Sequence, residues 1–327
     1  MTEPLRFAPL REGGGGVRIG LIDVDGHNFP NLVLMKLSAY HKAQGDTVEW
    51  WWSDFIHYDL VYMSKVFSNE YTPDMPEPMN ADRVIKGGTG YAIDMESGKE
   101  VYHKERDPVL PPEIENICPD YSIYPELAKN TAYGFLTRGC LRGCAFCHVA
   151  KKEGCKSWQV AELSQFWTGQ QNIEIMDPNI LACKDRVKLL EQLAVSGAYV
   201  NFNQGLDIRL TNKDVAELIG RIRVKRLHFA WDNPKDDLRE HFARFSAWYR
   251  RKDPSKKVVY VLTNFGSTLE EDLYRIYTLR DLGYDPYVMI YNKSGAPQEV
   301  RHLQRWCNNR LIFRAQPDFS KYDPKRG

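Results

Sequence analysis

The chain has 327 residues, enough for two domains or for one large barrel with an appended unit, and either would bury a sizeable core. Its 44 Lys and Arg residues nearly balance 43 Asp and Glu residues, which excludes a global field that recruits nucleic acid or an anionic membrane. No apolar stretch is long enough to span a bilayer, and residues 1–16 lack the apolar core of a signal peptide. We therefore expect a cytoplasmic protein without a membrane partner and with a flexible N-terminus over residues 1–16.

Residues 17–102 have the pattern of a small α/β domain. An apolar strand is predicted in VRIGLIDVDG, and the next segment, NLVLMKLSAYHKAQG, has helical spacing and ends near Gly45. Three further short runs, TVEWWW, YDLVYMSKVF and DRVIKGGTG, predict strands bounded by turn residues. The Pro-rich segment SNEYTPDMPEPMNA replaces the crossover helix expected between the last two strands. The pattern predicts a shortened flavodoxin-like or Rossmann-like domain.

Residues 103–130 contain five prolines and are predicted to form an extended linker. Over residues 131–312, six apolar strand candidates alternate with helical segments: TAYGFL, NIEIM, YVNFN, RLHFAW, VVYVL and PYVMIY. Because parallel strands need right-handed crossovers, this repeat predicts a parallel sheet that curls into a partial (β/α)6 TIM-type barrel. The chemistry of such folds lies at the carboxyl ends of the strands. Residues 313–327 are predicted to form a C-terminal tail.

The segment RGCLRGCAFCHVAKKEGC holds four of the seven cysteines. In a reducing compartment such thiols serve metal or thiolate chemistry rather than disulfides. The C-x3-C-x2-C spacing of Cys140, Cys144 and Cys147 lets a compact loop turn three thiolates toward one point. Three thiolates fill three irons of a 4Fe-4S cluster and leave the fourth iron open. The scattered thiols are expected to be ordinary small buried side chains: Cys118, Cys183 and Cys307.

Two other interpretations of this segment remain open. Cys155 could be a fourth ligand that closes a structural zinc or Fe-S site, although the segment before it is long and basic. The sequence CAFCH also matches the C-x-x-C-H pattern of haem attachment, which is typical of exported chains. The first interpretation would require Cys155 in addition to the three closely spaced cysteines.

The stretch GFLTRGCLRGCAFC resembles the signature of the radical SAM superfamily, with Phe146 just before the last cysteine. The resemblance covers residues 131–312, and the preceding unit is similar to a shortened cobalamin-binding-type domain found in one branch of that superfamily. It implies that Cys140, Cys144 and Cys147 ligate a 4Fe-4S cluster whose open iron chelates S-adenosylmethionine (SAM). It further implies that one electron, from a donor such as flavodoxin or ferredoxin, cleaves SAM to a 5'-deoxyadenosyl radical that acts on a substrate.

The resemblance also implies SAM contacts at the carboxyl ends of successive barrel strands. Phe146 is expected near the adenine. Asp177 and Asn179 could accept hydrogen bonds from the methionine ammonium, with an Asp-Pro turn as the other interpretation. Two departures from the family pattern are Leu141, at a position that is often proline, and the absence of Gly-Gly-Glu after the second strand. The remaining candidates follow the next three strands: Gln204, Arg209, Asp232 and Asn264.

The sequence does not identify the substrate, and two alternatives stay open. Within the family, the alternative is a cobalamin-dependent methyltransferase, because the pair Gly87-Gly88 would let a corrin approach the backbone. Against it, the crossover is shortened and His27 is interpreted as a turn residue, which favours a structural or substrate-gating domain. The alternative of another class is a non-catalytic zinc or Fe-S module for electron transfer or nucleic-acid binding.

Two basic runs, GRIRVKRLHF and RRKDPSKK, bear on nucleic acid as a partner. Basic residues with neighbouring aromatic residues could follow a phosphate backbone. We interpret both runs instead as solvated strand edges and helix ends, on the face opposite the expected active site. Nucleic acid is therefore not the favoured partner at this point.

Overall fold

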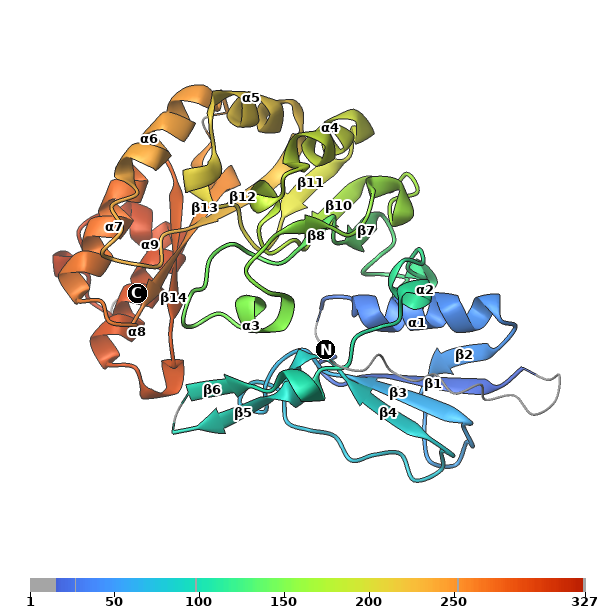
Figure 1. The fold of residues 1–327 in the computed structure, drawn as a ribbon. Coiled ribbons are helices and arrows are strands. Elements are labelled where there is room, and N and C mark those ends of the chain that lie inside the picture. Colours follow the sequence, from blue (N-terminus) through green and yellow to red (C-terminus); the bar gives the residue numbers. More distant parts are fainter. Residues whose placement is uncertain (1–15, 27, 98, 252, 326–327) are drawn as a thin grey trace. The chain divides into compact units, whose positions relative to one another are not determined.

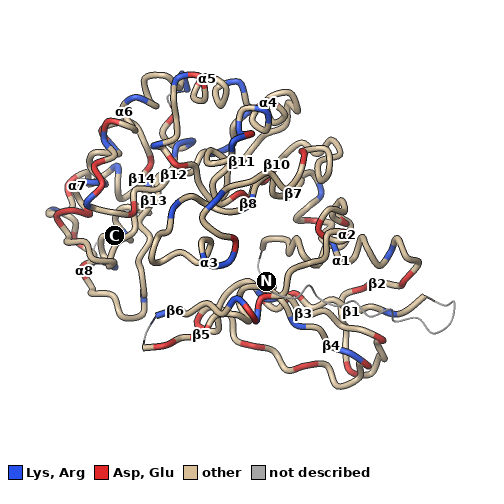
Figure 2. Tube along the Cα trace, viewed as in Figure 1, with Lys and Arg blue, Asp and Glu red and all other residues tan. Residues whose placement is uncertain are grey.

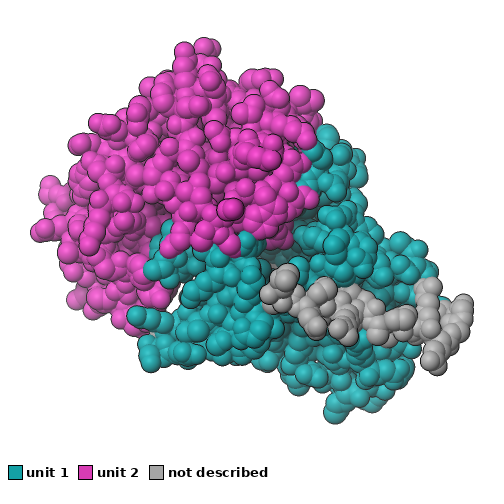
Figure 3. Space-filling model, viewed as in Figure 1, with its two compact units in different colours: residues 1–134, 144–153, 161–171 teal, residues 135–143, 154–160, 172–327 magenta. Residues whose placement is uncertain are grey.

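The computed structural model describes residues 16–325 except residues 27, 98 and 252. The predicted flexible N-terminus, apart from Gly16, and His27 lie outside the described residues. The chain forms two compact units that are interleaved in sequence (Figure 3). Unit 1 contains the described part of residues 1–134 together with 144–153 and 161–171, and unit 2 contains residues 135–143, 154–160 and the described part of 172–327. The prediction of an α/β fold with parallel sheets is confirmed.

Unit 1 contains a four-stranded parallel sheet with the order β2-β1-β3-β4. Helix α1 begins after Asn31, whose side chain accepts a hydrogen bond from the backbone N–H of Leu34. No helix forms in residues 65–83, between β3 and β4, as the Pro-rich composition predicted. The elements of this sheet are β1 (Arg18–Asp23), α1 (Leu32–Ala43), β2 (Thr47–Trp50), β3 (Leu60–Ser64) and β4 (Val84–Gly87).

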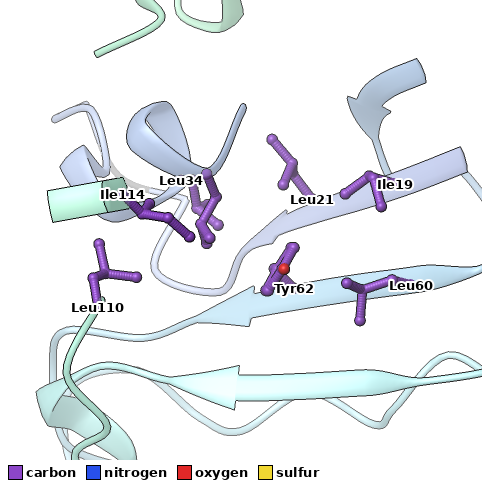
Figure 4. Close-up of a cluster of buried hydrophobic side chains, with 8 residues drawn as sticks. Ile19, Leu21, Leu34, Leu60, Tyr62, Leu110 and Ile114 are labelled. Atoms are coloured by element: carbon purple, nitrogen blue, oxygen red, sulfur yellow. The ribbon is translucent and has the colours of Figure 1, made fainter. Parts of the chain in front are cut away.

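The core of unit 1 includes part of the segment predicted as a linker. Leu34 of α1 and Tyr62 of β3 belong to a buried apolar cluster, together with Leu110 and Ile114 from the Pro-rich segment (Figure 4). Ile114 lies in the short helix α2 (Pro112–Glu115) and is fully buried. Residues 103–130 are therefore packed into unit 1 rather than extended between domains.

A hairpin that the sequence did not indicate follows the first sheet. Strands β5 (Ile93–Glu96) and β6 (Lys99–Tyr102) pair antiparallel. Their sequences, IDME and KEVY, are short and largely polar, so they lack the apolar runs that marked the other strands.

The strands of the second sheet follow one another in chain order, β14-β13-β12-β11-β10-β7. Every pair from β10 to β14 is parallel. A helix follows each of these strands, and Figure 1 shows the helices as an outer arc along one side of the sheet. The strands are β7 (Thr131–Gly134), β10 (Asn172–Ile175), β11 (Tyr199–Phe202), β12 (Arg223–Ala230), β13 (Lys257–Thr263) and β14 (Asp285–Ile290). The helices are α4 (Arg186–Ser196), α5 (Lys213–Arg221), α6 (Arg239–Trp248), α7 (Leu269–Asp281), α8 (Gln298–Asn308) and α9 (Arg310–Ala315).

Strand β7 belongs to unit 1, and the other five strands, β10 to β14, form the unit 2 sheet. The two faces of the unit 2 sheet differ in their neighbours. Phe229 of β12 points toward the helices, because its ring contacts Phe242 and Phe245 of α6 at centroid distances of 6.1 and 5.1 Å. Since successive side chains of a strand point to opposite faces, His228 and Ala230 point away from the helices. We call the face that carries His228 and Ala230 the inner face.

Candidate functional site

A short antiparallel ribbon holds the segment that enters the cysteine motif. Strand β8 (Thr137–Arg138) pairs with β9 (Trp158–Gln159), and both belong to unit 2. Between them, Gly139 has a φ of 78°, and a Cβ at this position would collide with the carbonyl oxygen of Lys156. The backbone N–H of Cys140 donates to the carbonyl of Gly154 at 3.4 Å. The first cysteine of the motif is therefore fixed by its backbone, and only glycine fits before it.

The thiol of Cys140 lies among polar partners. Its Sγ accepts from the backbone N–H of Arg142 at 3.5 Å and from Nδ2 of Asn179 at 3.6 Å. Asn179 is only 3% exposed, and its Oδ1 is buried without a hydrogen-bond partner among the described residues. Two N–H groups therefore point at this sulfur, one from the backbone and one from a side chain. The orphaned oxygen is an acceptor without a donor, and such buried atoms are rare.

Asp177 is engaged by the chain itself. It follows β10, and its two carboxylate oxygens accept from the backbone N–H groups of Leu136 and Thr137, each at 2.7 Å. Oδ2 also accepts from the hydroxyl of Thr137 at 2.6 Å. Burial raises the pKa of Asp177 to about 7, and the three donors oppose that rise. Asp177 therefore holds the start of β8 through these contacts. This structural role accounts for the residue without a contact to a ligand.

The second and third cysteines belong to unit 1. The backbone N–H of Cys147 donates to the carbonyl of Cys144 at 3.0 Å, which closes a tight turn around Phe146. All three motif thiols and Phe146 are partly buried. Because the chain passes from unit 2 to unit 1 between Gly143 and Cys144, the convergence of the three thiolates stays a prediction.

The segment after Cys147 is held to the rest of unit 1 by two polar side-chain contacts. His148 Nε2 lies 3.0 Å from Oε2 of Glu100 in β6, and the other oxygen of Glu100 accepts from Ser68 at 2.7 Å. The hydrogen bond with His148 is the main reason that the pKa of Glu100 is lowered. In helix α3 (Val149–Glu153), Lys152 Nζ lies 2.8 Å from the buried carboxylate of Asp107. The unpredicted β5–β6 hairpin therefore supports the motif's C-terminal side.

A residue inside the motif, Arg142, is held by the loop after β11. Its Nε donates to Oδ2 of Asp207 at 2.6 Å, and the Nε of Arg209 donates to Oδ1 of the same carboxylate at 2.7 Å. Burial opposes the charge of Asp207, but these two guanidinium groups outweigh it and lower the pKa of this carboxyl. Arg209 also pairs with Asp236 at 3.2 Å, whereas Gln204 is exposed. No local pattern indicates the contact between Arg142 and Asp207, because 65 positions separate the two residues.

The carboxyl ends of β12 and β13 are tied together by a buried cation. Arg275 of α7 is 0% exposed and donates to the backbone carbonyls of Trp231 at 2.6 Å and Leu262 at 2.9 Å. It also donates to the carbonyl of Asp232 at 3.0 Å. Burial raises the pKa of Asp232 to about 6, although the charge of Arg275 opposes it. Sequence reasoning missed Arg275, because an arginine on an amphipathic helix is usually solvated.

Asn264 is held in an unusual backbone conformation at the end of β13. Its φ is 61°, and its Nδ2 donates to the carbonyl of Tyr291 at 2.7 Å. Asparagine tolerates this left-handed region better than most residues. The amide nitrogen thus bridges the ends of β13 and β14, and the adjoining Gly266 is exposed.

The other cysteines and glycines have local explanations. Cys183 and Cys307 are buried in apolar surroundings, whereas Cys118 is partly buried and Cys155 is exposed. At Gly88, with a φ of 102°, a Cβ would collide with the carbonyl of Lys65. Close backbone packing within unit 1 therefore accounts for this glycine without a corrin.

Comparisons with known proteins add no family to this picture. No protein-family model matches the chain, and no curated protein matches it. In the part of the chain that the structure describes, no helix combines the length and the apolar character needed to cross a bilayer.

Proposed function

We propose that the protein is a radical SAM enzyme in which Cys140, Cys144 and Cys147 ligate a 4Fe-4S cluster with one open iron. The observation that carries the proposal is the surroundings of Cys140. Two N–H groups meet its Sγ, which suits a thiolate ligand. Beside them, Oδ1 of Asn179 is a buried acceptor without a donor among the described residues. A cationic group of a bound ligand would supply the missing donor.

The arrangement of the strands supports this proposal. In unit 2, the parallel strands β10 to β14 lie in chain order with helices between them, which is the pattern of a partial (β/α)6 barrel. In unit 1, the parallel order β2-β1-β3-β4 is compatible with a shortened Rossmann-like domain. The candidate contacts follow β10, β11, β12 and β13, where enzymes of the barrel class carry their active-site groups.

When bound, the cluster would supply the electron that cleaves the sulfonium of SAM to methionine and a 5'-deoxyadenosyl radical. The chain's own residues bind and orient. Asn179 offers Oδ1 to the ammonium group of SAM, and Asp177 keeps the start of β8 in place through Thr137. Asp207 holds Arg142, and through it the chain between the first two cysteines. Asp232 offers a partly buried carboxylate at the end of β12.

The test is anaerobic reconstitution with iron and sulfide, reduction with dithionite, and detection of 5'-deoxyadenosine from SAM by mass spectrometry. Replacing Cys140, Cys144 or Cys147 with Ala should abolish both the cluster and the product. Cys155→Ala is the matched control, because this exposed thiol lies outside the proposed ligand set and the variant should keep its iron. Loss of iron in Cys155→Ala would favour the closed, non-catalytic module.

A second variant separates SAM binding from cluster assembly. Asn179→Leu keeps the size of the side chain but removes the orphaned acceptor and the Nδ2 donor to Cys140. Because the backbone N–H of Arg142 still meets the sulfur, we expect a cluster that forms but whose EPR signal no longer responds to SAM. An unchanged response of the EPR signal in this variant would exclude Asn179 from the SAM site.

A further inference from the structure

The inner face of the unit 2 sheet carries a row of side chains that the proposed chemistry does not use. The pairing register places Glu174 of β10 beside Asn201 of β11, and Asn201 beside Arg226 of β12. Nδ2 of Asn201 donates to Glu174 at 2.5 Å, and Lys225 Nζ lies 3.6 Å from the same carboxylate. The basic run forms the amino-terminal half of β12, where Arg223, Lys225 and Arg226 are exposed.

Arg226 is the excess cation of this row. It is exposed and has no hydrogen bond or close ion pair among the described residues, and its charge acts on Glu174 together with that of Lys225, which lies closer. Burial first, and the charge of Arg226 second, lower the pKa of His228. The imidazole of His228 is therefore neutral near pH 7, and its Nδ1 lies 2.8 Å from the carbonyl oxygen of Phe202.

An aromatic series runs from this row to the last strand. The rings of His228 and Tyr260 are stacked, with centroids 5.3 Å apart and an interplanar angle of 5°. Tyr260 in turn meets Tyr287 of β14 edge to face, with centroids 6.0 Å apart. Tyr287 is 42% exposed and Met289, two positions along the same strand, is 44% exposed. The inner face thus ends in an accessible flat ring, which offers stacking area.

A basic groove begins at the same tyrosine. Tyr287 lines a cavity of about 610 Å³ together with Lys293, Arg305 and Arg310. No carboxylate lines it, although Arg310 pairs with Asp285 beside it. The groove is open to solvent, and its charge suits an anionic ligand.

The backbone at this edge is closed to a peptide strand. The N–H of Val288 donates to Oδ1 of Asn308 at 2.8 Å, and its carbonyl accepts from Asn308 at 3.1 Å and from Gln304 at 3.2 Å. Side chains from α8 thus occupy the backbone groups that an added strand would need. A partner that binds here must use the side chains instead.

We infer that the inner face and the adjoining groove bind single-stranded nucleic acid, with a base on Tyr287 and phosphates near Arg226 and Lys293. Arg226 lies two strand spacings from β14, about 10 Å across the sheet, and four residues before Ala230, which is level with Tyr287, so it is also displaced by about 13 Å along the strand. That separation exceeds one phosphate and fits a chain of several. Figure 2 shows both signs of charge interspersed along the chain, so a local surface rather than a global field would do the binding.

The test measures fluorescence polarisation of labelled 12-nucleotide RNA and DNA strands, and of the matching duplex, with the full chain. No SAM or reductant is present. We expect saturable binding of at least one single strand at low salt, weaker binding of the duplex, and an affinity that falls with salt. The RNA and DNA arms identify which strand is preferred.

Variants with matched controls locate the surface. Tyr287→Leu should weaken binding by about five- to a hundredfold, because a stacked base is lost. Tyr274→Leu, on α7 and 46% exposed, should bind as the unaltered chain does. Arg226→Gln and Lys293→Gln should each reduce the slope of log affinity against log salt by about 0.7. Lys213→Gln removes the same charge from the exposed face of α5 and should leave that slope unchanged.

Three results would overturn the inference: no saturable binding at low salt, equal losses in Lys213→Gln and Arg226→Gln, or indifference to Tyr287→Leu. Because the assay requires neither cluster chemistry nor SAM, its failure is distinguishable from a failure of the proposed function. A chain that cleaves SAM but binds no strand would contradict only this inference.

Discussion

Two buried carboxylates each hold a segment next to Cys140, one through uncharged donors and the other through arginine side chains. Asp177, after β10, accepts only from uncharged donors, namely two backbone N–H groups and one hydroxyl. Asp207, after β11, accepts from the side chains of two arginines. Burial raises the pKa of Asp177 to about 7, whereas the arginines lower the pKa of Asp207.

The comparison shows what offsets the burial of a charge. Both side chains are nearly inaccessible, at 3% for Asp177 as a residue and 5% for the side chain of Asp207. The uncharged donors around Asp177 supply hydrogen bonds, but ionising this carboxyl still costs more than it would in water. The positive charges beside Asp207 more than offset the cost of burying its carboxylate. The loop before Cys140 is therefore held by hydrogen-bond geometry, and the loop after it by ion pairing.

The largest expected effect is at Asp177. Asp177→Ala leaves the buried N–H groups of Leu136 and Thr137 and the Thr137 hydroxyl without acceptors, so the free energy of unfolding should fall by about 4 kcal/mol. Urea denaturation measures the change. Asp177→Asn, which keeps one acceptor oxygen, should lose less, and equal losses in the two variants would contradict a role based on hydrogen bonds.

A smaller loss is expected at Asp207. In Asp207→Asn the charge of Arg142 loses its partner and that of Arg209 keeps only Asp236, but both side chains are about one-third exposed and can be solvated. The free energy of unfolding should fall by about 2 kcal/mol. Measured in high salt, this loss should shrink if it is ionic, whereas the loss from Asp177→Ala should persist.

The pH dependence of stability should separate the two residues by sign. The lowered pKa of Asp207 means that its contribution is present above its unfolded pKa of about 3.9 and is lost as the pH falls through the folded value. The raised pKa of Asp177 means that its contribution is full below about 3.9 and is lost as the pH rises through about 7. The test is the unfolding free energy of the unaltered chain minus that of Asp207→Asn or of Asp177→Asn, measured from pH 3 to pH 8. This difference should rise with pH for Asp207 and fall with pH for Asp177, and slopes of the same sign would contradict the comparison.

The smallest effect is expected at Arg142. Arg142→Gln removes one of two cations from Asp207, and Arg209 remains, so the free energy of unfolding should fall by about 1 kcal/mol or less. Arg239→Gln is a control, because among the described residues Arg239 pairs only with the exposed Asp237. If Arg142→Gln costs more than Asp207→Asn, Arg142 has a partner beyond this carboxylate.

Local patterns in the sequence predicted most of the regular elements. Apolar runs located the four strands of the first sheet and the six of the second, and glycine at Gly45 and proline around residue 76 marked where helices end or fail to form. The partial barrel, the Rossmann-like assignment and the cluster stay predictions, because they depend on how separate segments meet.

What the sequence did not reveal is mainly pairing over long distances. The contact of Arg142 with Asp207, the burial of Arg275 and the inner-face position of Arg226 all depend on tertiary neighbours. Composition and spacing do not distinguish an arginine on a solvated helix from one in a buried network, because both depend on residue type alone. The polar hairpin β5–β6 was missed because it lacks an apolar run.

The interleaving of the two units has a consequence for synthesis on the ribosome. The chain changes unit after residues 134, 143, 153, 160 and 171. Unit 1 therefore stays incomplete until residue 171 has emerged, although its own sheet ends at Gly87. During synthesis the four-stranded sheet of unit 1 is complete before residues 144–153 and 161–171, which also belong to this unit, have emerged. A pause in translation before residue 171 would therefore prolong the time for which unit 1 is incomplete and its apolar surface is exposed.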